Sequence, residues 1–302
     1  MTLTGFVLLY IAATIAIGVI AATRVKNTSD FALAGRSLPL PMVITATFAT
    51  WFGSETILGL PGRFIESGIA GVIEEPFGSG MALILVGTFF AHKLYKQNIL
   101  TLGDYYRDRY GRSVELLCSV AIVISYLGWV GAQVTALGLV INLITEGAVS
   151  MTTGMVIGAA VVLAYTMVGG MWSVAMTDFV QMIVIVVGLV AILWFATDLA
   201  GGMDKVVDYA RGRDLFHAFP EPTTTGWLFW ISAAMTMMIG SIPQQDVFQR
   251  VMSAKNLPTA VAGPILGGSF YILFAFVPMF IVVAAILVMP DAAEKMLSED
   301  PQ

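Results

Sequence analysis

Three observations predict that this chain is an all-α polytopic membrane protein. Hydrophobic residues make up 58% of its 302 residues and charged residues only 12%, against about 25% charged residues in a soluble domain. The mean hydropathy is +0.86. Eight stretches are long and apolar enough for a transmembrane helix, which needs about 20 such residues. This composition excludes a secreted enzyme, a nucleic-acid-binding protein and a disordered regulator.

The predicted spans follow one another along nearly the whole chain. The first lacks the basic start and the A-x-A cleavage site of a signal peptide, and Arg24 and Lys26 follow it, so we expect a retained helix. The loop 198–225 mixes acidic and basic residues and has room for a short amphipathic helix. In chain order, the eight spans are 3–23, 39–61, 70–91, 115–144, 151–168, 172–197, 226–245 and 257–289.

The basic residues predict how the chain is oriented in the membrane. The alternate loops 24–38, 92–114, 169–171 and 246–256 hold 10 of the 15 Lys and Arg, and the other loops hold 5. Cytoplasmic loops carry the excess of Lys and Arg. We therefore expect these loops in the cytoplasm and the N-terminus outside, and eight spans put residue 302 outside as well.

Glycine and proline interrupt two spans in corresponding places. The second span contains Gly53 and Gly59, and the seventh contains Gly240 and Pro243. Pairs of interrupted helices are typical of inverted-repeat transporters, whose unwound segments meet at the bilayer midplane. The second and seventh spans are therefore the expected location of the binding site.

Four acidic residues lie within the spans: Glu55, Glu74, Glu75 and Asp178. An ionisable side chain costs about 2.5–3.5 kcal/mol at the centre of a membrane helix, so each is a functional candidate. No Lys or Arg lies within the predicted spans at a comparable depth in the membrane. We therefore expect a proton, a metal cation such as Na⁺ or a cationic substrate to neutralise these carboxylates.

Structural explanations stand beside the functional ones. Glu74 and Glu75 are also compatible with wet positions near the outer interface, although Pro76 disfavours helical geometry at Glu75 and indicates a kink there. Glu55 is compatible with a neutral acid that hydrogen-bonds the broken helix, and Asp178 with an interfacial acid near the cytoplasm. The tryptophans at 51, 129, 172 and 230 are compatible with interface-belt residues.

Cysteine and histidine supply no sign of an enzyme or a resident metal. The single Cys118 excludes a disulfide framework and a cysteine-ligated metal site. His92 lies at a predicted helix end and His217 in the outer loop, and no His-Glu-x-x-His or Ser/His pair lies within the spans. We predict neither an enzyme nor a cofactor.

Three motifs, in order along the chain, carry a family resemblance. They are residues 29–38 (SDFALAGRSL), residues 169–181 (GGMWSVAMTDFVQ) and residues 249–256 (QRVMSAKN). Together they resemble the sodium:solute symporter family, and the resemblance covers nearly the whole chain. It implies a leucine-transporter-type fold of five-plus-five inverted repeats with one extra helix in front.

The resemblance also implies a domain map within a single transmembrane transporter domain, 1–302. Residues 1–38 are the extra helix and its cytoplasmic loop, 39–198 the first repeat, 199–225 the outer loop, and 226–302 the start of the second repeat. Family members are longer, so the second repeat is expected to be incomplete and the chain to be an N-terminal portion.

The family's sodium site maps onto the second span. Its main-chain carbonyl ligands match Ala49 and Phe52, and Asp178 matches the acidic residue near the cytoplasmic exit of sodium. The other side of this site is a Ser/Thr-bearing helix that is expected beyond residue 302. The coupling ion implied by the resemblance is Na⁺.

The substrate side combines features of two branches of the family. Residues 49–53 and 240–245 are most similar to the choline-transporting branch, in which aromatic side chains surround a quaternary ammonium group. Gln244 stands where that branch has a tryptophan, Glu55 departs from its glycine-rich turn, and Glu75 resembles a substrate-contacting acid of the sugar-transporting branch. The expected substrate contacts are Trp51, Glu55, Glu75, Trp129, Gln133 and Gln244.

The resemblance predicts a sodium-coupled secondary active symporter that imports a small polar or cationic organic solute by alternating access. The expected partners are that solute, the sodium ion and the lipid bilayer of the cell membrane, with no nucleic acid. Symporter-like modules also form the membrane input of histidine kinases, so a membrane sensor is the alternative. Reading the native transcript past codon 302 distinguishes the two.

Overall fold

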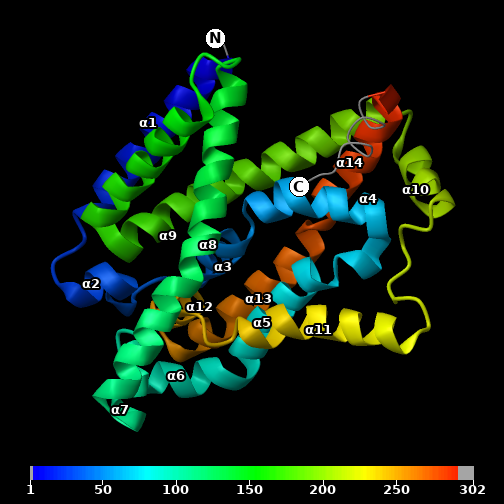
Figure 1. The fold of residues 1–302 in the computed structure, drawn as a ribbon. Helices are drawn as coiled ribbons and strands as arrows, with labels where there is room; N and C mark the ends of the chain where they lie inside the picture. Colours follow the sequence, from blue (N-terminus) through cyan, green and yellow to red (C-terminus); the bar gives the residue numbers. More distant parts are fainter. Residues whose placement is uncertain (1–2, 292–302) are drawn as a thin grey trace. The chain divides into compact units, whose positions relative to one another are not determined.

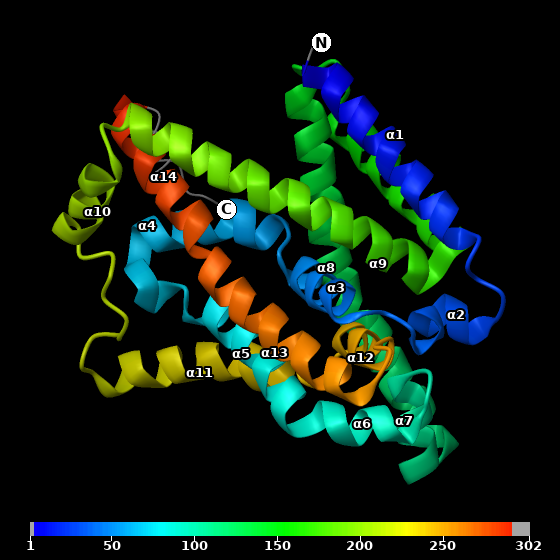
Figure 2. The same cartoon turned by 180° about the vertical axis from the view of Figure 1, so that it is seen from behind.

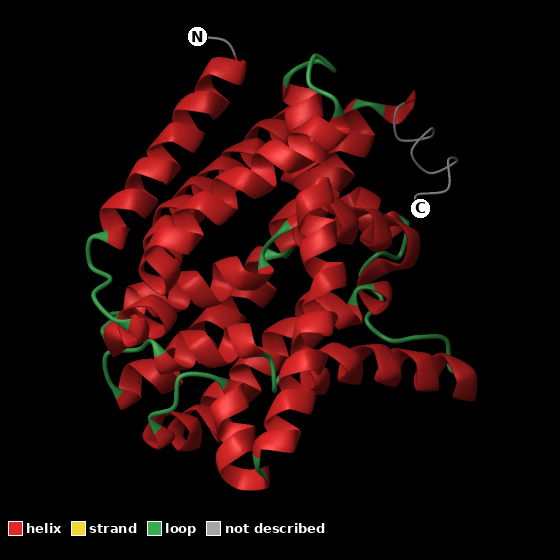
Figure 3. Ribbon diagram, turned by 60° about the vertical axis from the view of Figure 1, so that its left-hand side comes forward, coloured by secondary structure: helices red, strands yellow, loops and turns green. Residues whose placement is uncertain are grey.

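The computed structural model describes residues 3–291, and this part of the chain is built from helices joined by loops (Figures 1, 2 and 3). No strand occurs within it, and Leu38 and Ala254 form an isolated β-bridge. The polar run from Asp291 to Gln302 lies outside the described residues except for Asp291.

The chain divides into two compact units, each described here by itself. The first unit comprises Met1–Thr47, Gly87–Val180 and Pro243–Pro264, and the second comprises Phe48–Val86, Gln181–Ile242 and Ile265–Gln302. The predicted domain map of 39–198, 199–225 and 226–302 follows the repeats instead, and it stays a prediction.

The main helices of the first unit are α1 (Leu3–Ala22), α2 (Thr28–Leu33), α6 (Ala91–Gln97), α7 (Leu102–Tyr110), α8 (Arg112–Ile144) and α12 (Gln245–Met252). Those of the second are α4 (Leu60–Gly71), α5 (Ser79–Leu85), α10 (Met203–Gly212), α11 (Thr224–Gly240) and α14 (Phe276–Val288). The helices α3 (Leu40–Trp51), α9 (Met151–Leu199) and α13 (Leu257–Phe274) each contribute residues to both units. Shorter elements are η1 (Ala34–Arg36) and the π-helical η2 (Glu55–Gly59), η3 (Ile73–Gly78) and η4 (Val86–Phe90).

The second predicted span is interrupted, as its glycines indicate. The nitrogen of Phe52 donates to the oxygen of Phe48, 2.9 Å away, which continues the helical ladder of α3. The nitrogen of Gly53 donates instead to the oxygen of Trp51, also at 2.9 Å. Helix ends leave main-chain carbonyls without a helical N–H partner, so the end of α3 is where backbone oxygens become available to other ligands.

The seventh predicted span is also interrupted. Helix α11 ends at Gly240, α12 begins at Gln245, and the two are bent by 46° at the break. Gln244 has an extended backbone, with φ −82° and ψ 139°. Both predicted interruptions are therefore present in the fold.

Gly170 divides the longest helix. Its φ of 49° and ψ of −139° break the helical geometry of α9, and a Cβ atom there would lie 2.3 Å from the main-chain oxygen of Phe31. Only glycine tolerates both the positive φ and the close approach of the backbone. The predicted turn 169–171 between the fifth and sixth spans is this break.

Five helical segments of the described chain are long and apolar enough to cross a membrane, or six when the bent pair α11–α12 is taken as one span. This number differs from the predicted eight for two reasons. The fifth and sixth predicted spans are the two parts of α9, and the break after Trp51 leaves α3 with 12 residues. Each difference comes from how a broken helix is divided.

Helix α10 confirms the short amphipathic helix expected in the loop 198–225. Val206 and Ala210 are fully buried, one turn apart. Asp208 and Arg211 are exposed and lie 3.9 Å apart as an ion pair. Residues three and four positions apart share a helix face. One face of α10 therefore packs against the core of the second unit, and the opposite face is polar and exposed.

Candidate functional site

Glu75 lies where the backbone of the third predicted span departs from helical geometry. Its φ is −136° and its ψ is 121°, inside the π-helical segment η3. This confirms the kink expected from Pro76, because a residue before proline is displaced from the α region. The kink places the Glu75 carboxylate among side chains from other parts of the second unit.

Three hydroxyl groups donate hydrogen bonds to this carboxylate. Thr56 Oγ1 lies 3.0 Å from Glu75 Oε1, Ser79 Oγ lies 3.3 Å from Oε2, and the Tyr271 hydroxyl donates to Oε1. The Thr56 and Tyr271 hydroxyl oxygens are 3.0 Å apart. Thr56, Ser79 and Tyr271 are fully buried and Glu75 is half-buried. We call Thr56, Glu75, Ser79 and Tyr271 the carboxylate cluster.

An aromatic cluster adjoins the carboxylate cluster in the same unit. Phe48 and Phe52 stack with ring centroids 4.7 Å apart, and each lies about 6 Å from the Tyr271 ring in an edge-on arrangement. Phe274 packs against both phenylalanines, and the half-buried Trp51 packs against this group. Tyr271 therefore belongs to both clusters, with its ring among aromatic side chains and its hydroxyl on Glu75.

The main-chain oxygen of Trp51 also reaches this region. It accepts from the nitrogen of Gly53 and lies 3.3 Å from Thr56 Oγ1. Of the two predicted sodium ligands, Ala49 lies in the last turn of α3 and the almost fully buried Phe52 just after it. The structure thus places both residues at the helix break expected to supply carbonyl oxygens.

The expectation that the acidic residues lack protein counter-ions is wrong for Glu74. Arg63 Nη1 lies 3.9 Å from Glu74 Oε2, although both side chains are considerably exposed, so water weakens this pair. Glu55 is exposed in the second unit. No ion pair with Glu75 occurs within residues 3–291, and its carboxylate is held by hydroxyl groups alone.

Asp178 lies in the first unit, two turns beyond the break at Gly170. The side chain of the buried Thr177 beside it bonds to the backbone oxygens of Ser173 and Val174. Arg250 of α12 belongs to the same unit as Asp178.

The other predicted substrate contacts lie in the first unit. Trp129 and Gln133 are one turn apart on α8, and Gln244 directly precedes α12 at its N-cap position. The Tyr126 ring packs edge-on against Trp129 with centroids 6.4 Å apart. Tyr126 OH in turn donates to Asp246 Oδ1 at 2.5 Å.

The structure thus gathers Trp51, Phe52 and Glu75 around one region of the second unit, and it links Trp129 to the neighbourhood of Gln244 in the first. The roles predicted for these residues stay predictions. Sequence reasoning missed Thr56, Ser79, Tyr271, Tyr126 and Asp246. Ser79 follows Glu75 by four residues, a helical spacing that was a usable signal, whereas 196 positions separate Tyr271 from Glu75.

Comparison with known proteins agrees with the motifs. The family model for "Sodium:solute symporter family" matches residues 31–299. The high-affinity choline transporter 1 of Caenorhabditis elegans is 29% identical over 258 residues, which cover 84% of this chain and 43% of that protein. Its Homo sapiens counterpart is 30% identical, with 80% of this chain and 42% of that protein covered. Sodium/glucose cotransporter 4 of Danio rerio is 27% identical, with 92% and 45% covered.

A solved structure matches the fold. A Na⁺-coupled sialic acid symporter in a substrate-bound outward-open state superimposes with a TM-score of 0.83 at 18% sequence identity, covering 99% of this chain and 63% of that one. The predicted leucine-transporter-type helical fold is confirmed. The chain spans less than half the length of the curated relatives it matches. These relatives are transporters and not enzymes, and the chain is a multi-pass membrane protein that belongs to the sodium:solute symporter family.

Proposed function

We propose that the complete protein is a sodium-coupled symporter that imports a small cationic organic solute by alternating access. The observation that carries this proposal is the carboxylate cluster beside the aromatic cluster in the second unit. The Glu75 carboxylate, without a cationic partner among the described residues, offers an acidic group next to aromatic side chains. Aromatic rings supply electron-rich faces next to it, and such faces attract ammonium groups.

The cationic charge of the solute is favoured by two independent features. Hydroxyl donors offset part of the cost of burying the Glu75 carboxylate, and a cationic solute beside it would offset more. The named choline transporters are relatives at 29% and 30% identity, which supports a substrate with an ammonium group. Trp51 and Trp129 are the proposed aromatic contacts, and Glu55, Glu75, Gln133 and Gln244 the proposed polar ones.

The Gln244 position argues for a solute that forms a hydrogen bond at this point of the site. A tryptophan in this position of the choline-transporting branch offers a π face and one N–H donor, whereas the Gln244 amide both donates and accepts hydrogen bonds. We therefore propose a cation that also carries a hydrogen-bonding group. Choline, with its quaternary ammonium and its hydroxyl, is the first probe.

Sodium supplies the driving force in this proposal. The carbonyl oxygens of Ala49 and Phe52 bind the ion at the end of α3, and Asp178 lies on its path to the cytoplasm. One charge crossing 100 mV contributes about 2.3 kcal/mol. With the N-terminus outside the cell membrane, the Arg- and Lys-rich loops face the cytoplasm, and the proposed direction of transport is inward.

Uptake by the complete native polypeptide in proteoliposomes tests the proposal. An inward Na⁺ gradient is expected to drive accumulation of radiolabelled choline, and replacing external Na⁺ with K⁺ is expected to abolish it. A panel of quaternary and primary ammonium compounds that carry hydroxyl, amide or carboxylate groups then ranks the solutes by competition. Sodium-driven uptake of neutral sugars without competition by any ammonium compound would contradict a cationic substrate.

A further inference from the structure

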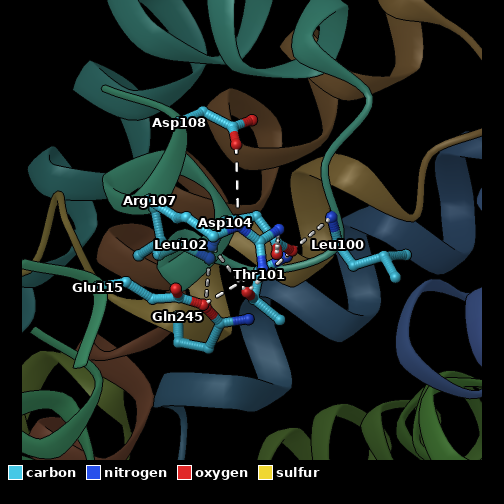
Figure 4. Close-up of polar contacts among 8 residues, drawn as sticks. All are labelled: Leu100, Thr101, Leu102, Asp104, Arg107, Asp108, Glu115 and Gln245. Carbon is cyan, nitrogen blue, oxygen red and sulfur yellow. Dashed lines mark hydrogen bonds and ion pairs between the residues drawn. The ribbon is translucent and has the colours of Figure 1, made fainter. Parts of the chain in front are cut away.

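Helices α7 and α12 of the first unit are each capped at the N-terminal end by a side chain from another helix. The first turn of a helix leaves main-chain N–H groups without a partner in the helix. A capping box serves part of α7: the nitrogen of Thr101 donates to Asp104 Oδ2 at 2.9 Å, and the nitrogen of Asp104 donates to Thr101 Oγ1 at 3.1 Å. The nitrogen of Leu102 donates to a side chain from elsewhere, Gln245 Oε1, at 2.9 Å (Figure 4).

The start of α12 is capped from α8 in the same way. The nitrogen of Asp246 donates to the Tyr126 hydroxyl at 3.2 Å, and this hydroxyl donates to Asp246 Oδ1 at 2.5 Å. Gln244, at the N-cap position of α12, makes no side-chain cap hydrogen bond. The first two residues of α12 are thus held by side-chain bonds to α7 and to α8. We call these contacts of Gln245 and Asp246 the α12 clamp.

The clamp connects the break before α12 with the hairpin formed by α7 and α8. Arg107 of α7 lies 2.7 Å from Asp104 Oδ1 and 3.4 Å from Glu115 Oε1 in the first turn of α8 (Figure 4). Phe248 and Met252 of α12 pack in one buried cluster with Leu102. The start of α12 therefore cannot shift without disturbing α7 or breaking these bonds.

Tyr126 also connects the α12 clamp with a proposed substrate contact, Trp129. Its ring packs edge-on against Trp129, three residues later on the same face of α8. Its hydroxyl holds Asp246, two residues after Gln244. One side chain thus contacts Trp129 and anchors the segment that carries Gln244.

We propose that Tyr126 and Gln245 are positioning residues, which rests on the proposed function. Through the clamp they fix Gln244 relative to Trp129 and couple solute binding to the α7–α8 hairpin. Neither side chain needs to touch the solute. Coupling of this kind travels through packed side chains and hydrogen bonds, and mutations along it change binding without contacting a ligand.

Uptake kinetics of the complete protein test the positioning role. Tyr126→Phe keeps the ring on Trp129 and removes the hydroxyl, and it is expected to raise the choline KM about tenfold while Vmax stays within about twofold. Asp246→Ala is expected to do the same, and Asp246→Asn, which keeps an acceptor oxygen, to restore most of the affinity. The double variant of Tyr126→Phe and Asp246→Ala should cost no more than either change alone.

The matched control is Tyr105→Phe. Tyr105 lies on α7, is half-buried, and packs edge-on against the Tyr106 ring. This variant is expected to keep the native KM. An unchanged KM in Tyr126→Phe, or an equal rise in the control, overturns the positioning role.

Hydrogen exchange separates failure of this inference from failure of the proposed function. In sodium-containing buffer without any solute, Gln245→Ala is expected to speed exchange of the Leu102 amide by about tenfold or more, and Gln245→Glu to keep it near the native rate. Native exchange in Gln245→Ala overturns the clamp. Faster exchange in a protein that takes up no ammonium compound upholds the clamp and overturns both the proposed substrate class and the positioning role.

Discussion

At the scale of single residues, Glu75 shows how a carboxylate is kept in an apolar region without a basic partner. Hydroxyl groups of Thr56, Ser79 and Tyr271 donate to its oxygens. An unpaired carboxylate in such surroundings is costly, and this arrangement offsets part of the cost. In the proposed function, the cationic solute supplies the rest of the compensation.

Replacing Glu75 with glutamine tests the importance of this charge. Glu75→Gln keeps an acceptor oxygen for the hydroxyl donors and removes the negative charge. The Coulomb attraction between two unit charges about 4 Å apart is about 1 kcal/mol in water and about 4 kcal/mol near a protein surface, so the apparent affinity for choline is expected to fall about 5- to 1,000-fold. Competition uptake measures it, with Glu66→Gln, an exposed glutamate on α4 of the same unit, as the control. Native affinity in Glu75→Gln would remove the carboxylate cluster from the substrate site.

Replacing Asp178 with asparagine tests its part in sodium coupling. The variant keeps the size and hydrogen-bonding capacity of the side chain but removes the charge. We expect the sodium concentration for half-maximal uptake to rise several-fold, with choline affinity at saturating Na⁺ nearly unchanged. Asp198→Asn, an exposed acid near the end of the same helix, is the control. Equal sodium dependence of Asp178→Asn and the native protein would refute the role.

At the scale of helices, glycine and proline made the breaks predictable. Gly53, Gly170 and Gly240 each marked an interruption or a turn that the structure contains. The kink at Glu75 was predictable from Pro76 because the restriction is local. Less predictable were the capping contacts of α7 and α12, since they join residues more than 100 positions apart.

The break at Gly170 yields a prediction about stability. Gly170→Ala puts a methyl group at a positive φ and about 2.3 Å from the Phe31 oxygen, so it is expected to lower the free energy of unfolding by at least about 1 kcal/mol. Gly188→Ala in the same helix adds a methyl group with no neighbour within 4 Å, and it is expected to be neutral or slightly stabilising. Thermal unfolding in detergent compares the two, and a smaller loss in Gly170→Ala than in Gly188→Ala would contradict the steric argument.

At the scale of the whole molecule, composition and motif order were sufficient to predict the fold class and the family. Each apolar span and each of the three motifs is a continuous run of residues and can be recognised without the fold. The family match from residue 31 to residue 299 agrees with them. The surroundings of the candidate site were only partly predictable. Residues near Trp51, Phe52 and Glu75 in the sequence indicate that these three belong to the site. No such local signal exists for Tyr271, which is 196 positions from Glu75 and reaches it only in the folded protein.

The length of the relatives leads to a prediction for the complete protein. This chain spans 42–45% of the named transporters, and the proposed sodium site needs a Ser/Thr-bearing helix beyond residue 302. A polypeptide ending at Gln302 is therefore expected to show no sodium-driven choline uptake, and the complete reading frame to restore it. Equal uptake by both in matched proteoliposomes would show that residues 1–302 close the site by themselves.

The 49 residues of α9 have a consequence for how the protein is made. At a rise of about 1.5 Å per residue, the two parts of α9 on either side of Gly170 have a combined length of about 70 Å, more than twice the thickness of the hydrocarbon core. The reversal at Gly170 carries no charged residue among its immediate neighbours, so the emerging chain offers no hydrophilic stop between the two halves. We expect both halves to leave the ribosome before either half is inserted into the membrane, and to enter the bilayer together as one hairpin.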